Sequence, residues 1–107
     1  MDLSKRKLGL MLSTPPDHPN LKTAVALSRT ALDHGGDVYL YLIDDGVYAK
    51  DRSEIRELAE HGAKLFVCAY GCQKRGLPLS DPDTFTYSGL VVLTDLINGC
   101  ERFIALD

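Results

Sequence analysis

The chain has 107 residues, of which 45% are hydrophobic and 25% are charged, and this predicts one small globular domain over residues 1–107. Twelve basic and fifteen acidic side chains give a formal net charge of −3, which argues against nucleic acid or an anionic membrane as a partner. No apolar stretch approaches the roughly 20 residues of a membrane helix. The basic residues 1–7 are not followed by the features of a secretory signal, so a cytoplasmic location is expected.

The chain contains three cysteines, an odd number that cannot all pair with one another. In a reducing compartment they are expected to be free thiols, a redox or transfer site, or packing residues. A domain of this size buries only about 60% of the surface of its unfolded chain, so oligomerisation would add to its stability.

The first half of the chain alternates between strand and helix patterns. Residues 7–13 form a short apolar run that ends before two prolines, which predicts a buried strand followed by a loop. Apolar residues then recur on one side of a helix from Asn20, its predicted N-cap, to the glycine stop at Gly35. A β-branched and aromatic run at residues 38–43 predicts the second strand, which ends at Asp44.

The second half continues the alternation. The pattern predicts helices at residues 53–61, with Ser53 as N-cap, and 69–75, strands at residues 64–67 and 102–106, and a proline-containing loop at residues 77–85. The apolar residues 90–97 fit either element, but Ser88 before them and Asn98 after them favour a helix.

Strands that alternate with helices are typical of right-handed βαβ units. The predicted fold is therefore an α/β three-layer sandwich with four or five mostly parallel strands and helices on both faces. Binding and reaction sites in such sheets lie beyond the carboxyl ends of the strands. These ends are expected at residues 13–19, 44–48 and 68–72.

Cys68 is the leading candidate for a reactive residue. It follows an apolar strand and opens the predicted short helix, where the positive end of the backbone dipole favours the nucleophilic thiolate. Lys74 and Arg75 add positive charge toward the far end of that helix. The alternative is a buried cysteine at a strand end that packs as a small hydrophobic side chain.

Cys72 lies four residues after Cys68, so a helix would place both sulfurs on one face about one turn apart. As an auxiliary thiol it would resolve a sulfenic acid or persulfide on Cys68, or receive sulfur from it. The spacing is not that of a C-x-x-C motif, and no second pair completes a zinc site. Packing is the alternative for Cys72 and the expectation for Cys100.

Polar residues also fall on two loops at the same predicted edge of the sheet: Asp17, His18, Asp44 and Asp45. Carboxylates of this kind bind Mg²⁺, although turn and capping roles for Asp17 and Asp45 are the favoured explanation. The sequence has neither a glycine-rich nucleotide-binding motif nor a serine nucleophile elbow. No metal ion and no cofactor is predicted.

Three stretches of the chain suggest a family. The first joins the opening strand and residues 14–20 to the helix that ends at Gly35, and the second is the strand that ends at Gly46-Val47-Tyr48. The third and most specific covers residues 67–77 (VCAYGCQKRGL), where a cysteine after an apolar strand is followed by a basic pair and a glycine. With similar segments at residues 85–90 and 100–103, the chain resembles the DsrE/TusD (DsrE/DsrF-like) sulfur-relay proteins over nearly its whole length.

The resemblance implies a flavodoxin-like sandwich that assembles as a trimer or hexamer, from identical or paralogous subunits. It also implies a sulfur carrier or sulfurtransferase that takes sulfane sulfur from a donor protein, holds it as a cysteine persulfide and passes it to an acceptor protein, in tRNA thiolation or in sulfur oxidation. By position, the family cysteine is Cys68. Many members have alanine where this chain has Cys72, and some members lack the family cysteine.

The leading hypothesis is a cytoplasmic sulfur carrier or sulfurtransferase that uses Cys68, with Cys72 as an auxiliary thiol. The pocket around the thiol is predicted to include Thr14, Pro15, Gly46, Val47, Tyr48 and Tyr70. One alternative is a non-catalytic oligomeric binding subunit with structural cysteines. Another is a metal- or phosphate-binding module that uses Asp17, Asp44 and Asp45.

Overall fold

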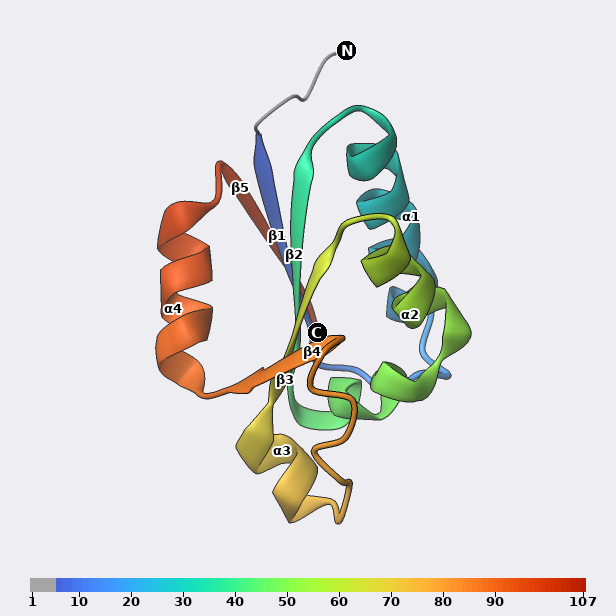
Figure 1. Ribbon diagram of the computed structural model, residues 1–107, viewed down its shortest axis with the longest axis vertical. Coiled ribbons are helices and arrows are strands. Elements are labelled where there is room, and N and C mark those ends of the chain that lie inside the picture. Colours follow the sequence, from blue (N-terminus) through green and yellow to red (C-terminus); the bar gives the residue numbers. More distant parts are fainter. Residues whose placement is uncertain (1–5) are drawn as a thin grey trace.

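The computed structural model describes residues 6–107, so most of the basic segment considered above as a possible signal lies outside the described residues. The elements are β1 (Lys7–Leu12), α1 (Asn20–Asp33), β2 (Asp37–Leu42), the 3₁₀ segment η1 (Asp44–Asp51), α2 (Ser53–Glu60), β3 (Lys64–Cys68), α3 (Ala69–Lys74), β4 (Phe85–Ser88), α4 (Leu90–Gly99) and β5 (Arg102–Leu106). Figure 1 shows their arrangement.

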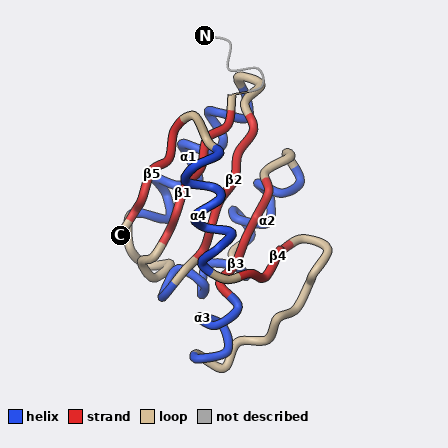
Figure 2. The backbone as a smooth tube through the Cα atoms, turned by 90° about the vertical axis from the view of Figure 1, so that its left-hand side faces the viewer, coloured by secondary structure: helices blue, strands red, loops and turns tan. Residues whose placement is uncertain are grey.

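The five strands form one sheet in the order β4-β3-β2-β1-β5, and every neighbouring pair is parallel. Helices α1 and α2 cover one face and α4 covers the other (Figure 1). The predicted α/β sandwich with a parallel sheet is therefore confirmed, and it has a flavodoxin-like architecture. Helix α3 lies beyond the carboxyl end of β3, and a long loop returns from it to the edge strand β4 (Figure 2).

The two faces of the sheet differ in chemistry because successive side chains of a strand point to opposite sides. On the face toward α1 and α2 the central strands contribute fully or nearly fully buried aliphatic side chains: Leu10, Leu12, Leu40, Leu42, Leu65 and Val67. On the other face Tyr39 lines a small cavity together with residues of α4, so Tyr41 and, by register, Phe66 and Cys68 point to the same side. Among the strands, α4 packs on β1 and β5, so the polar side chains lie over β2 to β4.

Several local predictions are wrong. Residues 85–88 form the edge strand β4, and residues 44–51 form η1, where a strand end and loops were expected. Asn20 and Ser53 are the first helical residues rather than N-caps, and neither cap position makes a side-chain hydrogen bond. The Asn20 N–H instead donates to His18 Nδ1 at 3.0 Å, so the preceding loop supplies the missing acceptor.

Helix α4 confirms the helical alternative for residues 90–97, which extends to Gly99. Over residues 6–107, the structure contains no helix with both the length and the apolar character needed to span a membrane.

Gly46 allows η1 to pack directly on the end of β1. A Cβ atom at this position would lie 2.0 Å from the Leu12 carbonyl oxygen and 2.7 Å from its carbon. That carbonyl is fixed, because it accepts a hydrogen bond of 3.0 Å from the Ile43 N–H. Only glycine therefore fits at position 46 without a shift of the backbone.

Gly46→Ala is expected to lower the free energy of unfolding by about 3 kcal/mol, because the clash is with backbone rather than with a side chain that can move. The matched control is Gly99→Ala, since a Cβ atom there meets nothing within 4 Å. Urea denaturation measures both variants, and a Gly46→Ala protein as stable as the control would contradict this packing.

Candidate functional site

A cavity of about 360 Å³ lies at the carboxyl ends of the three adjacent strands β2, β3 and β4. Its lining residues are Ile43, Asp44, Cys68, Tyr70, Gly71, Lys74, Arg75, Gly89 and Leu90. The chain leaves β2 toward the face covered by α2 and leaves β4 toward the face covered by α4 (Figure 1). Such a divergence of connections opens a crevice at the sheet edge, which is where α/β proteins bind ligands.

Cys68 lies at the junction of β3 and α3, as predicted, and it is the N-cap of α3. Its Sγ accepts a hydrogen bond of 3.3 Å from the Gly71 N–H. The residue is only 6% exposed, but it lines the cavity. A backbone N–H directed at the sulfur stabilises the thiolate, and the cavity gives a small reagent a path to it.

Gly71 brings α3 close to its surroundings. A Cβ atom at Gly71 would lie 3.3 Å from Val47 Cγ1 and 3.6 Å from Cys68 Sγ. Val47 is fully buried, so it forms the support beneath α3 and does not line the cavity. The close approach of η1, α3 and the sulfur thus depends on a residue without a side chain.

Lys74, the last residue of α3, and Arg75, the C-cap of that helix, have different environments. The Arg75 guanidinium contacts Asp45 Oδ1 through Nε at 3.1 Å and through Nη2 at 3.0 Å, and its Nη1 donates to the Gly71 carbonyl at 3.2 Å. Arg75 therefore ties α3 to η1, with its charge balanced. Lys74 makes no ion pair within residues 6–107 and lies on the cavity wall, which also includes Asp44.

Cys72 is completely buried and does not line the Cys68 cavity. Burial raises the pKa of its thiol, while the nearby Lys50 ammonium acts in the opposite direction. Lys50 is itself buried and donates to Ser80 Oγ at 3.2 Å. These surroundings favour the neutral thiol and agree with the packing alternative for Cys72.

Cys100 precedes β5 at the opposite end of the sheet, where it lines a separate cavity of about 160 Å³. It is half-buried rather than part of the core, which corrects the prediction. Burial is the main cause that raises the pKa of its thiol. All three cysteines are free.

Of the six predicted pocket residues, Tyr70 lines the cavity. Thr14 and Pro15 do not, because β1 is separated from β3 by β2 and its loop leads into α1. Gly46 and Val47 belong to η1 and are buried outside the cavity wall, and Tyr48 is exposed outside the cavity. The residues that sequence reasoning missed include Gly89 and Leu90, because the strand before them was not recognised.

The four polar loop residues do not form a single cluster. Asp45 pairs with Arg75, and Asp44 lines the Cys68 cavity. Asp17 and His18 line another cavity of about 200 Å³ beside α1 and α2. In the described part of the chain, no group of three or more His, Cys, Asp and Glu side chains could hold a metal ion, so the metal-binding alternative has no ligand set there.

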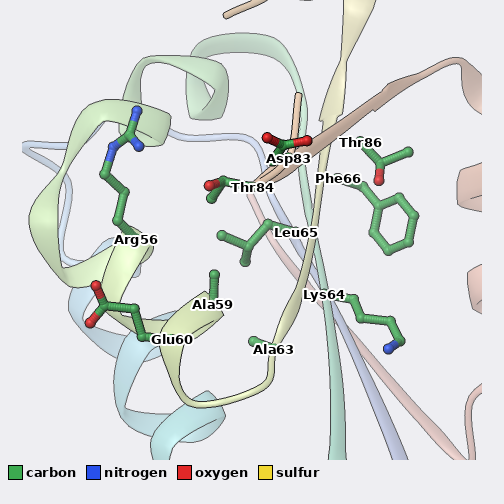
Figure 3. A pocket seen from close by; sticks show the side chains of 10 residues that line it. All are labelled: Arg56, Ala59, Glu60, Ala63, Lys64, Leu65, Phe66, Asp83, Thr84 and Thr86. Atoms are coloured by element: carbon green, nitrogen blue, oxygen red, sulfur yellow. The ribbon is translucent and has the colours of Figure 1, made fainter. Parts of the chain in front are cut away.

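A larger cavity of about 520 Å³ lies between α2 and the β3–β4 edge. Figure 3 shows Arg56 and Glu60 of α2 on one side of β3, and Lys64, Phe66 and Thr86 on the other. Arg56 forms ion pairs with Asp81 and Asp51. The cavity has no cysteine or histidine in its wall, so the smaller cavity at Cys68 is the better candidate site.

Comparisons with known proteins identify the family. The model of the DsrE/DsrF-like family matches residues 6–106. No curated protein matches the chain. The solved structure of the YchN protein from E. coli is similar with a TM-score of 0.71 and 18% identity, over 95% of this chain and 99% of that one. A conserved protein of unknown function from Bacteroides thetaiotaomicron has a TM-score of 0.78 and 16% identity, over 94% of each chain.

At these identities the two solved structures support the fold alone, whereas the family match covers nearly every described residue. The chain belongs to the DsrE/DsrF-like family, which is in general a sulfur-relay family.

Proposed function

We propose that this protein is a sulfur carrier or sulfurtransferase that accepts sulfane sulfur on Cys68 as a persulfide and passes it to an acceptor protein. The observation that carries the proposal is the position of Cys68. Its sulfur accepts the Gly71 N–H and lines a cavity at the carboxyl edge of the sheet. Cys72 is fully buried away from that cavity and would act only as an auxiliary thiol.

The transfer needs no external oxidant or reductant. The Cys68 thiolate attacks the outer sulfur of a donor persulfide, a new S–S bond forms, and the donor leaves as a thiolate that takes up a proton. In the second half, the acceptor thiolate attacks the outer sulfur on Cys68. The bond between Cys68 Sγ and the outer sulfur then breaks, and Cys68 returns as a thiolate that again accepts a hydrogen bond from the Gly71 N–H.

Lys74 places a cation on the wall of the cavity. It makes no ion pair within the described residues, whereas Arg75 is occupied by Asp45, and the Asp44 side chain also lines the cavity. A positive charge on the cavity wall stabilises the negative charge that moves between the sulfur atoms when the thiolate attacks a protonated persulfide.

A relay also needs partners. Exposed apolar side chains lie on α3 and α4: Tyr70, Leu90, Val91 and Ile97. Two of them, Tyr70 and Leu90, also line the cavity. We propose that this surface binds another subunit, in a homo-oligomeric or paralogous trimer or hexamer, or a sulfur donor or acceptor protein in the cytoplasm. The oligomer mass in solution distinguishes self-association from binding of another protein.

Incubation with a persulfide donor is expected to add the mass of one sulfur atom, about 32 Da, to the peptide that contains Cys68. Cys68→Ser should lose this adduct, and the matched control Cys100→Ser should keep it, because Cys100 lies at the other end of the sheet. Mass spectrometry of the intact protein and its peptides measures both. An equal adduct on Cys68→Ser would refute the proposal.

Alkylation by iodoacetamide at neutral pH separates this function from the non-catalytic alternative. Cys68 should react about tenfold faster than Cys72 and Cys100. Burial raises the pKa of the latter two thiols, so less of each is thiolate at neutral pH, and their rates should rise as the pH increases toward those values. Uniformly slow modification of all three cysteines would favour a binding subunit with structural cysteines.

Lys74→Gln is expected to slow the reaction of Cys68 with the anion iodoacetate about threefold at low salt, and to leave its reaction with neutral iodoacetamide nearly unchanged. The control is Lys64→Gln, because Lys64 begins the strand that Cys68 ends. An unchanged ratio of the two alkylation rates, or the same change in the control, would show that Lys74 does not attract the anion.

A further inference from the structure

The Tyr41 side chain crosses the sheet next to Cys68. Tyr41 lies on β2 and is fully buried, yet its hydroxyl reaches the carbonyl oxygens of Gly89 at 3.0 Å and Ser88 at 3.3 Å, at the end of β4. Strand β3 lies between β2 and β4. To reach those carbonyls, the Tyr41 ring must therefore pass over β3 near its carboxyl end.

The register shows which face the ring crosses. Tyr41 pairs with Phe66, and Cys68 lies two residues further along β3, so both side chains point to the same side of the sheet. Cys68 in turn pairs with Ser88 on β4. The Tyr41 hydroxyl, the Ser88 side chain and the Cys68 sulfur therefore meet on one face at the end of three strands.

The titration of Tyr41 agrees with this placement. Burial is the main cause that raises the pKa of its hydroxyl, the nearby Ser88 hydroxyl lowers that pKa, and Cys68 raises it through its charge and through hydrogen bonding with the phenol. Ser88 and Cys68 are therefore both close enough to Tyr41 to affect the protonation of the phenol.

The two hydroxyls at this position differ in their present hydrogen bonds, but each has a proton that it can donate to the sulfur. Ser88 Oγ is buried and has no hydrogen-bond partner. The single Tyr41 proton can bond only one acceptor well at a time and already has two carbonyl oxygens within reach, so turning toward the sulfur exchanges a carbonyl acceptor for an anionic one, which forms the stronger hydrogen bond. A buried hydroxyl without a hydrogen-bond partner costs free energy. When such a hydroxyl lies next to a thiol that becomes an anion, it can donate a hydrogen bond to the sulfur, and this cost is removed.

We propose that the hydroxyls of Tyr41 and Ser88 form a donor pair that stabilises negative charge on the Cys68 sulfur, as a thiolate and as a persulfide. This inference deepens the proposed function and its role in sulfur transfer rests on it. No covalent bond changes: each O–H rotates toward the anionic sulfur. With the Gly71 N–H, the donor pair provides three hydrogen-bond donors from three different elements.

The test is the pH dependence of Cys68 alkylation in Tyr41→Phe, Ser88→Ala and the double variant. In the double variant the pH of half-maximal rate should rise by about one unit, which slows the reaction about tenfold at neutral pH, and each single variant should give part of this shift. Matched controls are Tyr39→Phe and Thr86→Val, because each residue lies two positions earlier on the same strand and face. A double variant with the profile of the unaltered protein would overturn the inference.

A reciprocal measurement avoids dependence on the folding of these variants. Cys68→Ser should lower the pKa of Tyr41, because the contribution of the cysteine is removed while burial remains. The absorbance of the phenolate during titration measures this change, with Tyr41→Phe as the reference for the difference spectrum. NMR of labelled tyrosine can replace the absorbance measurement. An unchanged Tyr41 pKa in folded Cys68→Ser would overturn the inference.

These measurements are independent of sulfur donors. A shifted alkylation profile without a persulfide adduct would refute the sulfur-carrier function and leave the donor pair as a device that stabilises the thiolate. An adduct on Cys68 with an unshifted profile would refute the donor pair and leave the sulfur-carrier function intact.

Discussion

The hydrogen bond from the Gly71 N–H to Cys68 Sγ forms because β3 ends at the residue where α3 begins. That junction is held from below, since Gly71 approaches Val47 of η1 too closely for a side chain to fit comfortably. The 3₁₀ segment η1 is held in turn where Gly46 packs on the Leu12 carbonyl of β1. Close packing at these two glycines therefore links β1 to the sulfur through η1 and α3.

The same short helix places two thiols in opposite environments. Cys68 is at the start of α3, beside a cavity and a backbone donor, whereas Cys72 is one turn later and fully buried. Desolvation disfavours a charged thiolate, and burial accordingly raises the pKa of Cys72. The charge of Lys50 opposes that effect, but the same ammonium group also donates a hydrogen bond to Ser80 and forms an ion pair with Asp51. Burial and donors, rather than spacing in the sequence, thus separate a candidate nucleophile from a packing residue.

The sequence predicts the parts of this site that depend on local patterns. The apolar strand before Cys68, the helix after it and the helical form of residues 90–97 follow from periodicity and flanking residues, and the structure confirms them. β4 has only four residues after two prolines, and its pairing with β3 is a non-local contact that no local pattern reveals. The cavity wall at Gly89 and Leu90 was therefore missed.

Thr14 and Pro15 were wrongly assigned to this cavity for a related reason. Carboxyl ends of parallel strands share an edge, but the order of the strands decides which ends are neighbours. That order places β2 and β4 beside β3 and places β1 one strand further away. Register also explains why the Tyr41 and Ser88 hydroxyls escaped notice, since they meet Cys68 only once three strands are aligned.

The unequal covering of the sheet connects the site to its partners. Helix α4 packs on β1 and β5, and the same face over β2 to β4 carries Tyr41, Phe66, Cys68 and Ser88, so aromatic rings, hydroxyls and a thiol take the place of an aliphatic layer there. Leu90 begins α4, lines the cavity and is largely exposed, as is Tyr70 on the other rim. In the proposed relay, a partner that covers these two apolar side chains would also close the cavity. A persulfide on Cys68 would then be shielded from water and stray thiols until the cavity opens to an acceptor sulfur.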